Sequence, residues 1–181
     1  MLTIVVPEGE FFNETTQEFV YTKEQKLVLE HSLVSVAKWE AKWKKPFLDK
    51  NDKTPEETLD YIRCMTITKG VDPSVYANLT QESINKINTY IDDKMTATTF
   101  VDHKSQPPGR EKITSELIYY WMIDFGIPVE FEKWHLNRLL TLIKVCSIKA
   151  QGNGKKMSRK EILAQNNELN AIRRKQLGSK G

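Results

Sequence analysis

Residues 115–150, SELIYYWMIDFGIPVEFEKWHLNRLLTLIKVCSIKA, contain the most strongly apolar helical pattern of the chain. Within it, Leu117–Ile123 is apolar on nearly every side, so a helix formed by these residues must be buried on more than one face, by the rest of the chain or by a partner subunit. Gly126 is placed to end that helix, and Pro128 to begin a longer one that continues to about Ala150. The tight connection between the two predicts a helical hairpin.

Two groups of residues are candidates for contact with a partner protein. The first group consists of aromatic residues of the hairpin, for which core packing is the alternative that the sequence leaves open: Tyr119, Tyr120, Trp121 and Trp134. The second group belongs to a C-terminal helix whose apolar stripe is too thin to hold it in place alone. We expect this helix to be mobile in the free monomer and ordered against a partner through Leu163, Leu169, Ile172, Arg173 and Arg174.

The N-terminal part of the chain predicts three short strands. Runs rich in β-branched and aromatic residues lie between polar turns at Leu2–Val6, 18–22 and 26–30. We expect these strands to form a small antiparallel sheet or meander. Three strands need a cover to be stable, and the helix that follows them can supply it.

That helix is predicted to begin after Ser32, a good N-cap residue, and to run to about Lys44. Trp39 and Trp43 lie one turn apart on the same face. With the lysines around them they have the composition of a stacking platform for nucleic acid. We prefer the interpretation that the tryptophans pack on the sheet while the lysines face water.

Further helices are marked by their capping residues. Thr54, with a proline and two acids after it, is a strong helix start, and Gly70 is the expected stop. Asp72 opens a short helical turn, and Thr80 caps another helix that runs to about Asp93.

The predicted fold class is α+β and mostly α-helical, with a small N-terminal antiparallel sheet, a helical bundle and a mobile basic C-terminal helix. The stretch from Thr96 to Lys112 has no periodicity and contains Pro-Pro-Gly, so it reads as a loop or a boundary. The expected parts are a sheet with helices in 1–95, a flexible loop in 96–113, the helical hairpin in 114–151 and the basic arm in 152–181.

Charge is distributed unevenly along the 181 residues, whose net charge is +3. Residues 155–181 contain eight basic and two acidic residues, a charge of +6, which leaves −3 for residues 1–154. The basic residues do not form one stripe, so nucleic acid is an unlikely partner for this arm. No stretch approaches the roughly 20 apolar residues of a membrane span, and we expect neither a membrane protein nor a secretory signal at the N-terminus.

Catalytic chemistry is not indicated by the sequence. It has no Gly-rich phosphate loop, no nucleophile elbow and no Cys-x-x-Cys motif. Cys64 and Cys146 are expected to be small buried hydrophobic residues, and His31, His103 and His135 have no metal-ligand spacing. For His135 we favour a structural hydrogen bond at the hairpin. We therefore expect no enzyme activity, no catalytic residues, no metal and no cofactor.

The hairpin sequence resembles a family of small proteins from long-tailed bacteriophages. The similar segments are Glu116–Pro128, with its apolar helix and Gly-Ile turn, and Glu132–Ile143, which opens with Trp-His. A short basic segment like Met157–Ile162 follows in that family. Together the likeness spans residues 114–177 and is to the tail assembly chaperones of siphovirus-like phages.

This resemblance implies a non-enzymatic protein that binds the phage tape-measure protein, and with it the tail-tube protein, in the host bacterial cytoplasm during tail assembly. It would keep the long apolar helices of the tape-measure protein soluble until tube subunits polymerise around them. A virion structural protein, such as a tail or head–tail connector subunit that forms homo-oligomers, is the alternative. A nucleic-acid-binding module is the third hypothesis.

Overall fold

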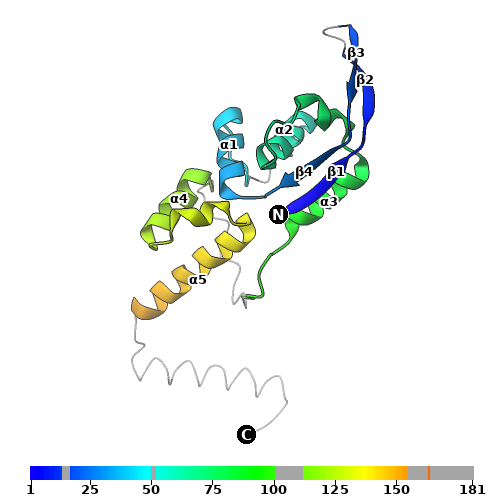
Figure 1. The fold of residues 1–181 in the computed structure, drawn as a ribbon. Coiled ribbons are helices and arrows are strands. Elements are labelled where there is room, and N and C mark those ends of the chain that lie inside the picture. The colour runs from blue at the N-terminus through cyan, green and yellow to red at the C-terminus, as the bar shows by residue number, and fades with distance from the viewer. Residues whose placement is uncertain (14–16, 50–51, 101–111, 155–162, 164–181) are drawn as a thin grey trace, which may run out of the picture. The chain divides into compact units, whose positions relative to one another are not determined.

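The computed structural model of the chain describes residues 1–13, 17–49, 52–100, 112–154 and 163 (Figure 1). It confirms the α+β, mostly helical fold with a small antiparallel sheet near the N-terminus. The chain divides into two units, Met1–Ile143 and Lys144–Gly181. Most of the expected loop 96–113 and of the expected basic arm lies outside the described residues.

The four strands form one long antiparallel hairpin that is interrupted once. β1 pairs with β4 and β2 pairs with β3; the bounds are Leu2–Val6 for β1, Gly9–Asn13 for β2, Glu18–Thr22 for β3 and Gln25–Leu29 for β4. Val6 lies opposite Gln25 and Gly9 lies opposite Thr22, so the register is the same on both sides of the interruption. Pro7 stands at this break, where a residue without an N–H interrupts the ladder.

The sheet differs from the sequence expectation in two details. A meander of three strands would place the second between the first and the third, whereas here the first strand pairs with the last. In addition, β2 is a strand that the sequence analysis misses. Its two phenylalanines are adjacent, with polar residues on either side, so the alternation typical of a half-buried strand is absent.

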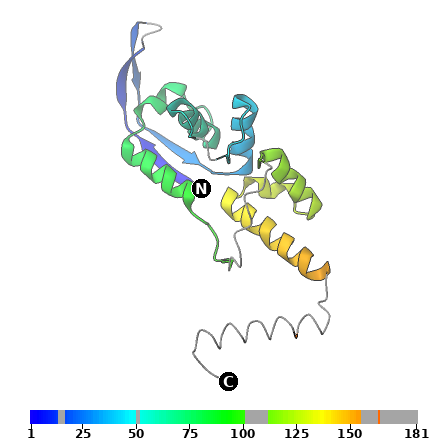
Figure 2. The same cartoon turned by 180° about the vertical axis from the view of Figure 1, so that it is seen from behind.

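The core lies against one face of β1 and β4. That face is fully or almost fully buried and consists of Ile4, Val6, Leu27 and Leu29. One helix follows these strands directly in the chain, and a second helix lies beside them in space. Helix α1, Leu33–Trp43, begins directly after β4, and helix α3, Gln81–Asp92, lies along β1 (Figures 1 and 2). Ser32 caps α1 as predicted, since its hydroxyl accepts the Ser35 N–H at 3.3 Å.

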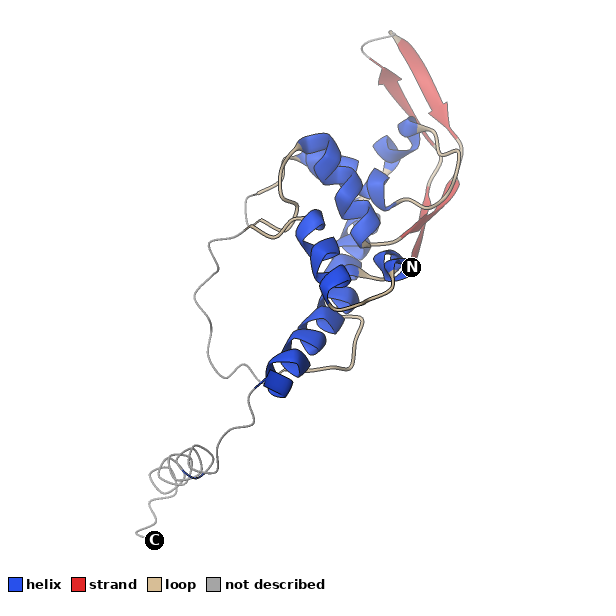
Figure 3. Cartoon of the chain, turned by 90° about the vertical axis from the view of Figure 1, so that its left-hand side faces the viewer, coloured by secondary structure: helices blue, strands red, loops and turns tan. Residues whose placement is uncertain are grey.

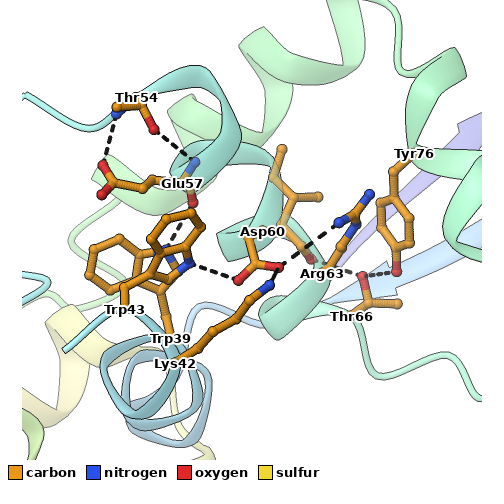
Figure 4. A network of polar contacts seen from close by, with 10 residues as sticks. Trp39, Lys42, Trp43, Thr54, Glu57, Asp60, Arg63, Thr66 and Tyr76 are labelled. Atoms are coloured by element: carbon orange, nitrogen blue, oxygen red, sulfur yellow. Dashed lines mark hydrogen bonds and ion pairs between the residues drawn. The ribbon is translucent and has the colours of Figure 1, made fainter. Parts of the chain in front are cut away.

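Helix α2, Pro55–Met65, packs against α1 through the two tryptophans (Figure 4). The indole N–H of Trp39 donates to the backbone carbonyl of Glu57 at 2.8 Å, and that of Trp43 donates to the Asp60 carboxylate at 2.9 Å. Lys42 also binds Asp60, at 2.5 Å. The tryptophans therefore direct their polar atoms at α2, where we expected them to meet the sheet. Trp39 is buried and cannot serve as a stacking platform.

Helix α2 ends earlier than the predicted stop at Gly70. Its last residue is Met65, and the chain then pairs with the end of β4. The Glu30 N–H donates to the Met65 carbonyl at 2.9 Å, and the Ile67 N–H donates to the Val28 carbonyl at 2.8 Å. These two bonds extend the sheet edge and draw the backbone out of the helix before the glycine is reached.

The helices that follow begin where capping residues predict them. The short helix η1 spans Pro73–Asn78 after Asp72, and α3 is capped by Thr80. Helix α4, Ser115–Asp124, is capped by Thr114. Its end is a Schellman turn in which Gly126 has a φ of +63° and the Ile127 N–H reaches back to the Met122 carbonyl at 2.8 Å.

The long helix predicted from Pro128 to about Ala150 is in fact two helices. A short helix η2, Val129–Lys133, comes first, and helix α5, Leu136–Gly154, follows after a break at Trp134 and His135. The Leu136 N–H donates to the His31 carbonyl at 2.7 Å, and His135 pairs with Ser32. This tertiary pairing interrupts the helix, and no local pattern announces it.

Glu40 ties three segments together from inside the molecule. Its buried carboxylate accepts the backbone N–H of Phe47 at 2.7 Å, the backbone N–H of Ser115 at 2.8 Å and the hydroxyl of Ser115 at 2.5 Å. A negative charge at the first residue of α4 also suits the helix dipole.

We therefore expect Glu40→Ala to lower the free energy of unfolding by about 1–3 kcal/mol, because buried donors lose their acceptor. Urea denaturation followed by tryptophan fluorescence measures the change. Glu24→Ala, which removes an exposed glutamate, is the matched control and should change stability by less than about 0.5 kcal/mol. Equal stability of the two variants would show that the Glu40 bridge contributes nothing.

Candidate protein-binding surface

The aromatic hairpin is held to the rest of unit Met1–Ile143 by a buried pair of histidines. The rings of His31 and His135 lie edge to face with centroids 5.0 Å apart. Nδ1 of His31 and the hydroxyl of Tyr61 are hydrogen-bonded at 2.5 Å, and Nε2 of His135 donates to the backbone carbonyl of Tyr90 at 2.9 Å. The Tyr90 hydroxyl in turn donates to Glu30 at 2.6 Å. His135 thus has the structural hydrogen bond that the sequence favours.

Burial shifts the pKa values of His31 and Tyr90 at this junction. It lowers the pKa of His31 to about 3, with a further contribution from the nearby His135. Burial and the hydrogen bond to the Glu30 carboxylate raise the pKa of Tyr90 above its ordinary value. These groups therefore stay neutral at physiological pH, as members of a packed junction do.

A pocket of about 250 Å³ lies beside the junction and is lined by Met1, Glu30, Tyr90, Met95, Lys133, Trp134, His135 and Arg138. Both oxygens of Glu30 are occupied there, one by the Tyr90 hydroxyl and the other by the N-terminal amine at 2.9 Å. Nδ1 of His135 is buried and has no hydrogen-bond partner among the described residues, so it does not reach the pocket. Glu30 and His135 therefore each hold another part of the fold beside this pocket.

Helix α4 presents an apolar outer face to solvent. Tyr120 and Ile123 lie three residues apart, on one face of the helix, with 60% and 79% of their surface exposed. Val129, the first residue of η2, is also exposed. The opposite face of α4 is buried through Ile118 and Met122. We call Tyr120 and Ile123 the α4 face.

The predicted hairpin residues divide between this face and the interior. Tyr120 is exposed as an interface residue would be, whereas Tyr119, Trp121 and Trp134 are half-buried. Tyr119 donates its hydroxyl to Glu132 at 2.8 Å, which fixes α4 to η2. Trp134 stacks on Phe131 with ring centroids 3.9 Å apart, and the Arg138 guanidinium lies 4.0 Å from the Trp134 ring centroid.

The predicted contacts of the C-terminal arm are described only in part. Leu163 is exposed. Leu169, Ile172, Arg173 and Arg174 lie outside the described residues. Sequence reasoning missed two exposed aliphatic residues, Ile123 of the α4 face and Val129 of η2. The helical spacing from Tyr120 to Ile123 is the signal that could have found the first of them.

Other candidate sites are not supported by the geometry. Cys64 and Cys146 are half-buried free thiols, so the expectation of full burial is wrong for both. Among the described residues, no group of three or more histidine, cysteine or acidic side chains is arranged to hold a metal ion. None of the described helices combines the length and the apolar character that crossing a bilayer requires.

The histidine junction predicts a pH dependence of stability. The unfolded chain binds a proton at His31 below about pH 6.5, whereas the folded chain does so only near pH 3. Protons therefore favour unfolding in this window, and stability that is complete above pH 6.5 is lost as the pH falls, by up to about 1.4 kcal/mol per pH unit from this group.

Urea denaturation at a series of pH values from 7 to 5 checks this slope. His31→Gln has a packing cost that is the same at every pH, so its stability should fall less steeply than that of the natural chain. Identical slopes for the two proteins would contradict the assignment of the effect to His31.

Comparisons with known proteins find no relative of this chain. No protein-family model matches the chain. Neither the curated proteins nor the solved structures contain a match. The candidate surface therefore rests on its own residues.

Proposed function

We propose that this chain is a non-enzymatic protein-binding protein and that the α4 face receives the apolar side of a helical partner. The observation that carries the proposal is the exposure of Tyr120 and Ile123 on a helix whose other side is part of the core. Large apolar side chains grouped on one face of a rigid element are typical of protein interaction sites. An amphipathic partner helix is a common occupant of such a surface.

The specific form of this function is that of a phage tail assembly chaperone. The support is the resemblance of residues 114–177, which include the whole α4 face. Its client is then the tape-measure protein, whose long apolar helices need a cover before the tail tube encloses them. The place of action is the host bacterial cytoplasm during assembly.

The absence of enzyme activity in this proposal is supported by the chemistry of the histidine junction. Catalysis by Glu30 or His135 would require a free carboxylate oxygen or a free imidazole nitrogen next to solvent. The Glu30 oxygens are both hydrogen-bonded or ion-paired, and His135 donates to a backbone carbonyl. The residues that look most like an acid–base pair are therefore engaged in holding the fold.

Copurification with the tape-measure protein tests this function. The full chain is expressed together with a tagged tape-measure protein of a long-tailed phage, and the amount recovered on the tagged client is measured. We expect Tyr120→Glu and Ile123→Glu each to reduce recovery at least about tenfold, because a charge placed in an apolar contact must be desolvated.

Val5→Glu is the matched control, since Val5 is an exposed apolar residue on β1 and its register partner is Lys26. Circular dichroism establishes that all three variants are folded. Undiminished recovery of the two α4 variants would contradict the role of this face. Proteomics of mature particles adds a second criterion: stoichiometric copies in the virion would exclude a chaperone and favour the structural-subunit alternative.

A further inference from the structure

The β2–β3 hairpin carries a second exposed surface, which is unrelated to the α4 face. Phe12, Phe19 and Tyr21 are 48%, 70% and 61% exposed. Phe12 and Phe19 are register partners whose rings meet edge to face at 5.2 Å, and Tyr21 lies two residues further along the same strand. Alternation along a strand therefore places all three on one side of the hairpin. We call them the hairpin face.

Nothing in the described residues covers this face. β2 and β3 pair only with each other, and they continue past the helices (Figure 3). The anchoring contact is at the base, where the Thr22 hydroxyl donates to the Gly9 carbonyl at 3.2 Å and the Asn78 amide donates to Thr22. An isolated two-stranded hairpin is marginally stable in water, so three large exposed rings on it are a feature that folding does not explain.

The charges around the hairpin face are almost all negative. Residues 8–24 contain five glutamates and one lysine. Glu10 is the register partner of Tyr21 and so shares its side, and the Tyr21 hydroxyl donates to the Glu8 carboxylate at 2.7 Å. Glu18, at the start of β3, is also exposed, but alternation places it on the opposite side of the hairpin. Aromatic rings and carboxylates thus lie side by side on this surface, and the segment that forms it has more glutamates than lysines.

We propose that the hairpin face docks a lysine- and arginine-rich polypeptide segment of another protein. Ammonium and guanidinium groups are attracted to aromatic faces and to carboxylates together, and this combination is what the hairpin offers. The unpaired outer edges of β2 and β3 can add an extended segment through backbone hydrogen bonds. A second copy of the hairpin would bring glutamates against glutamates, and nucleic acid would bring phosphates against them, so charge disfavours both.

Fluorescence anisotropy with the full chain and a labelled synthetic peptide of lysine, arginine and threonine tests the proposal. This peptide has no large apolar side chain that the α4 face could bind. We expect saturable binding that weakens as salt is raised. A peptide in which glutamate replaces every lysine and arginine should not bind.

The variants assign the binding to its surface. Phe19→Ser removes the most exposed ring of the hairpin face, and Glu10→Lys reverses the charge opposite Tyr21. Each variant should weaken binding of the peptide at least about tenfold. Tyr120→Ser on α4 and Glu130→Lys on η2 are the matched controls. They make the same kinds of change as the two hairpin variants, also at exposed side chains, and should leave binding of the peptide unchanged. Tyr21→Phe keeps the ring, so its loss of affinity should be small. Circular dichroism establishes that each variant is folded.

Three outcomes would overturn the proposal. The first is no saturable binding of the basic peptide. The second is binding that the hairpin variants and the α4 and η2 variants change equally, which would mean attraction by overall charge alone. The third is concentration-dependent dimerisation of the natural chain that Phe19→Ser abolishes, which would make a second copy the occupant. None of these outcomes depends on whether the α4 face binds a client.

Discussion

The backbone pairing of His31 and Ser32 with His135 and Leu136 is the constraint on which the rest of the structure depends. Four elements meet at this point. His31 and Ser32 connect the end of β4 to α1, and His135 and Leu136 stand at the start of α5. The His135 ring also donates to the carbonyl of Tyr90, near the end of α3. The pairing uses main-chain groups, and the His31 imidazole beside it is packed in neutral form against the ring of His135. Because unpaired buried amides and imidazolium ions are both costly, this junction tolerates little variation in geometry.

The exposed surfaces follow from that junction. The break at Trp134 and His135 separates η2 from α5, and the hydrogen bond from Tyr119 to Glu132 joins η2 to α4. The core side of α4 is then set by Ile118 and Met122, and Tyr120 and Ile123 are left facing water. The position of the apolar surface is thus a consequence of the core. Its size is not, since other residue types at these two positions would satisfy the core equally well.

Local chemistry explains which features the sequence predicts correctly. Ser32, Thr54 and Thr80 cap helices where they are expected, and Gly126 adopts the left-handed conformation that ends α4. Each of these signals acts within four residues. The errors concern long-range pairing. The early end of α2 and the break before α5 depend on hydrogen bonds to distant segments, which periodicity does not encode. The strand β2 is missed for a local reason, because its adjacent phenylalanines do not alternate with polar residues. For the α4 face, the sequence analysis names Tyr120 but not Ile123.

Two neighbouring tyrosines on α4 show why residue type alone does not distinguish a side chain that holds the fold together from one that is exposed on the α4 face. Tyr119 and Tyr120 differ by one position, about 100° around the helix, and only the second is mostly exposed. The hydroxyl of Tyr119 holds the hairpin in shape, and burial together with Glu132 raises its pKa. The rigidity that this bond provides bears directly on binding. For the partner proposed above, binding a fixed helix face costs less conformational entropy than binding a loop that must first be ordered.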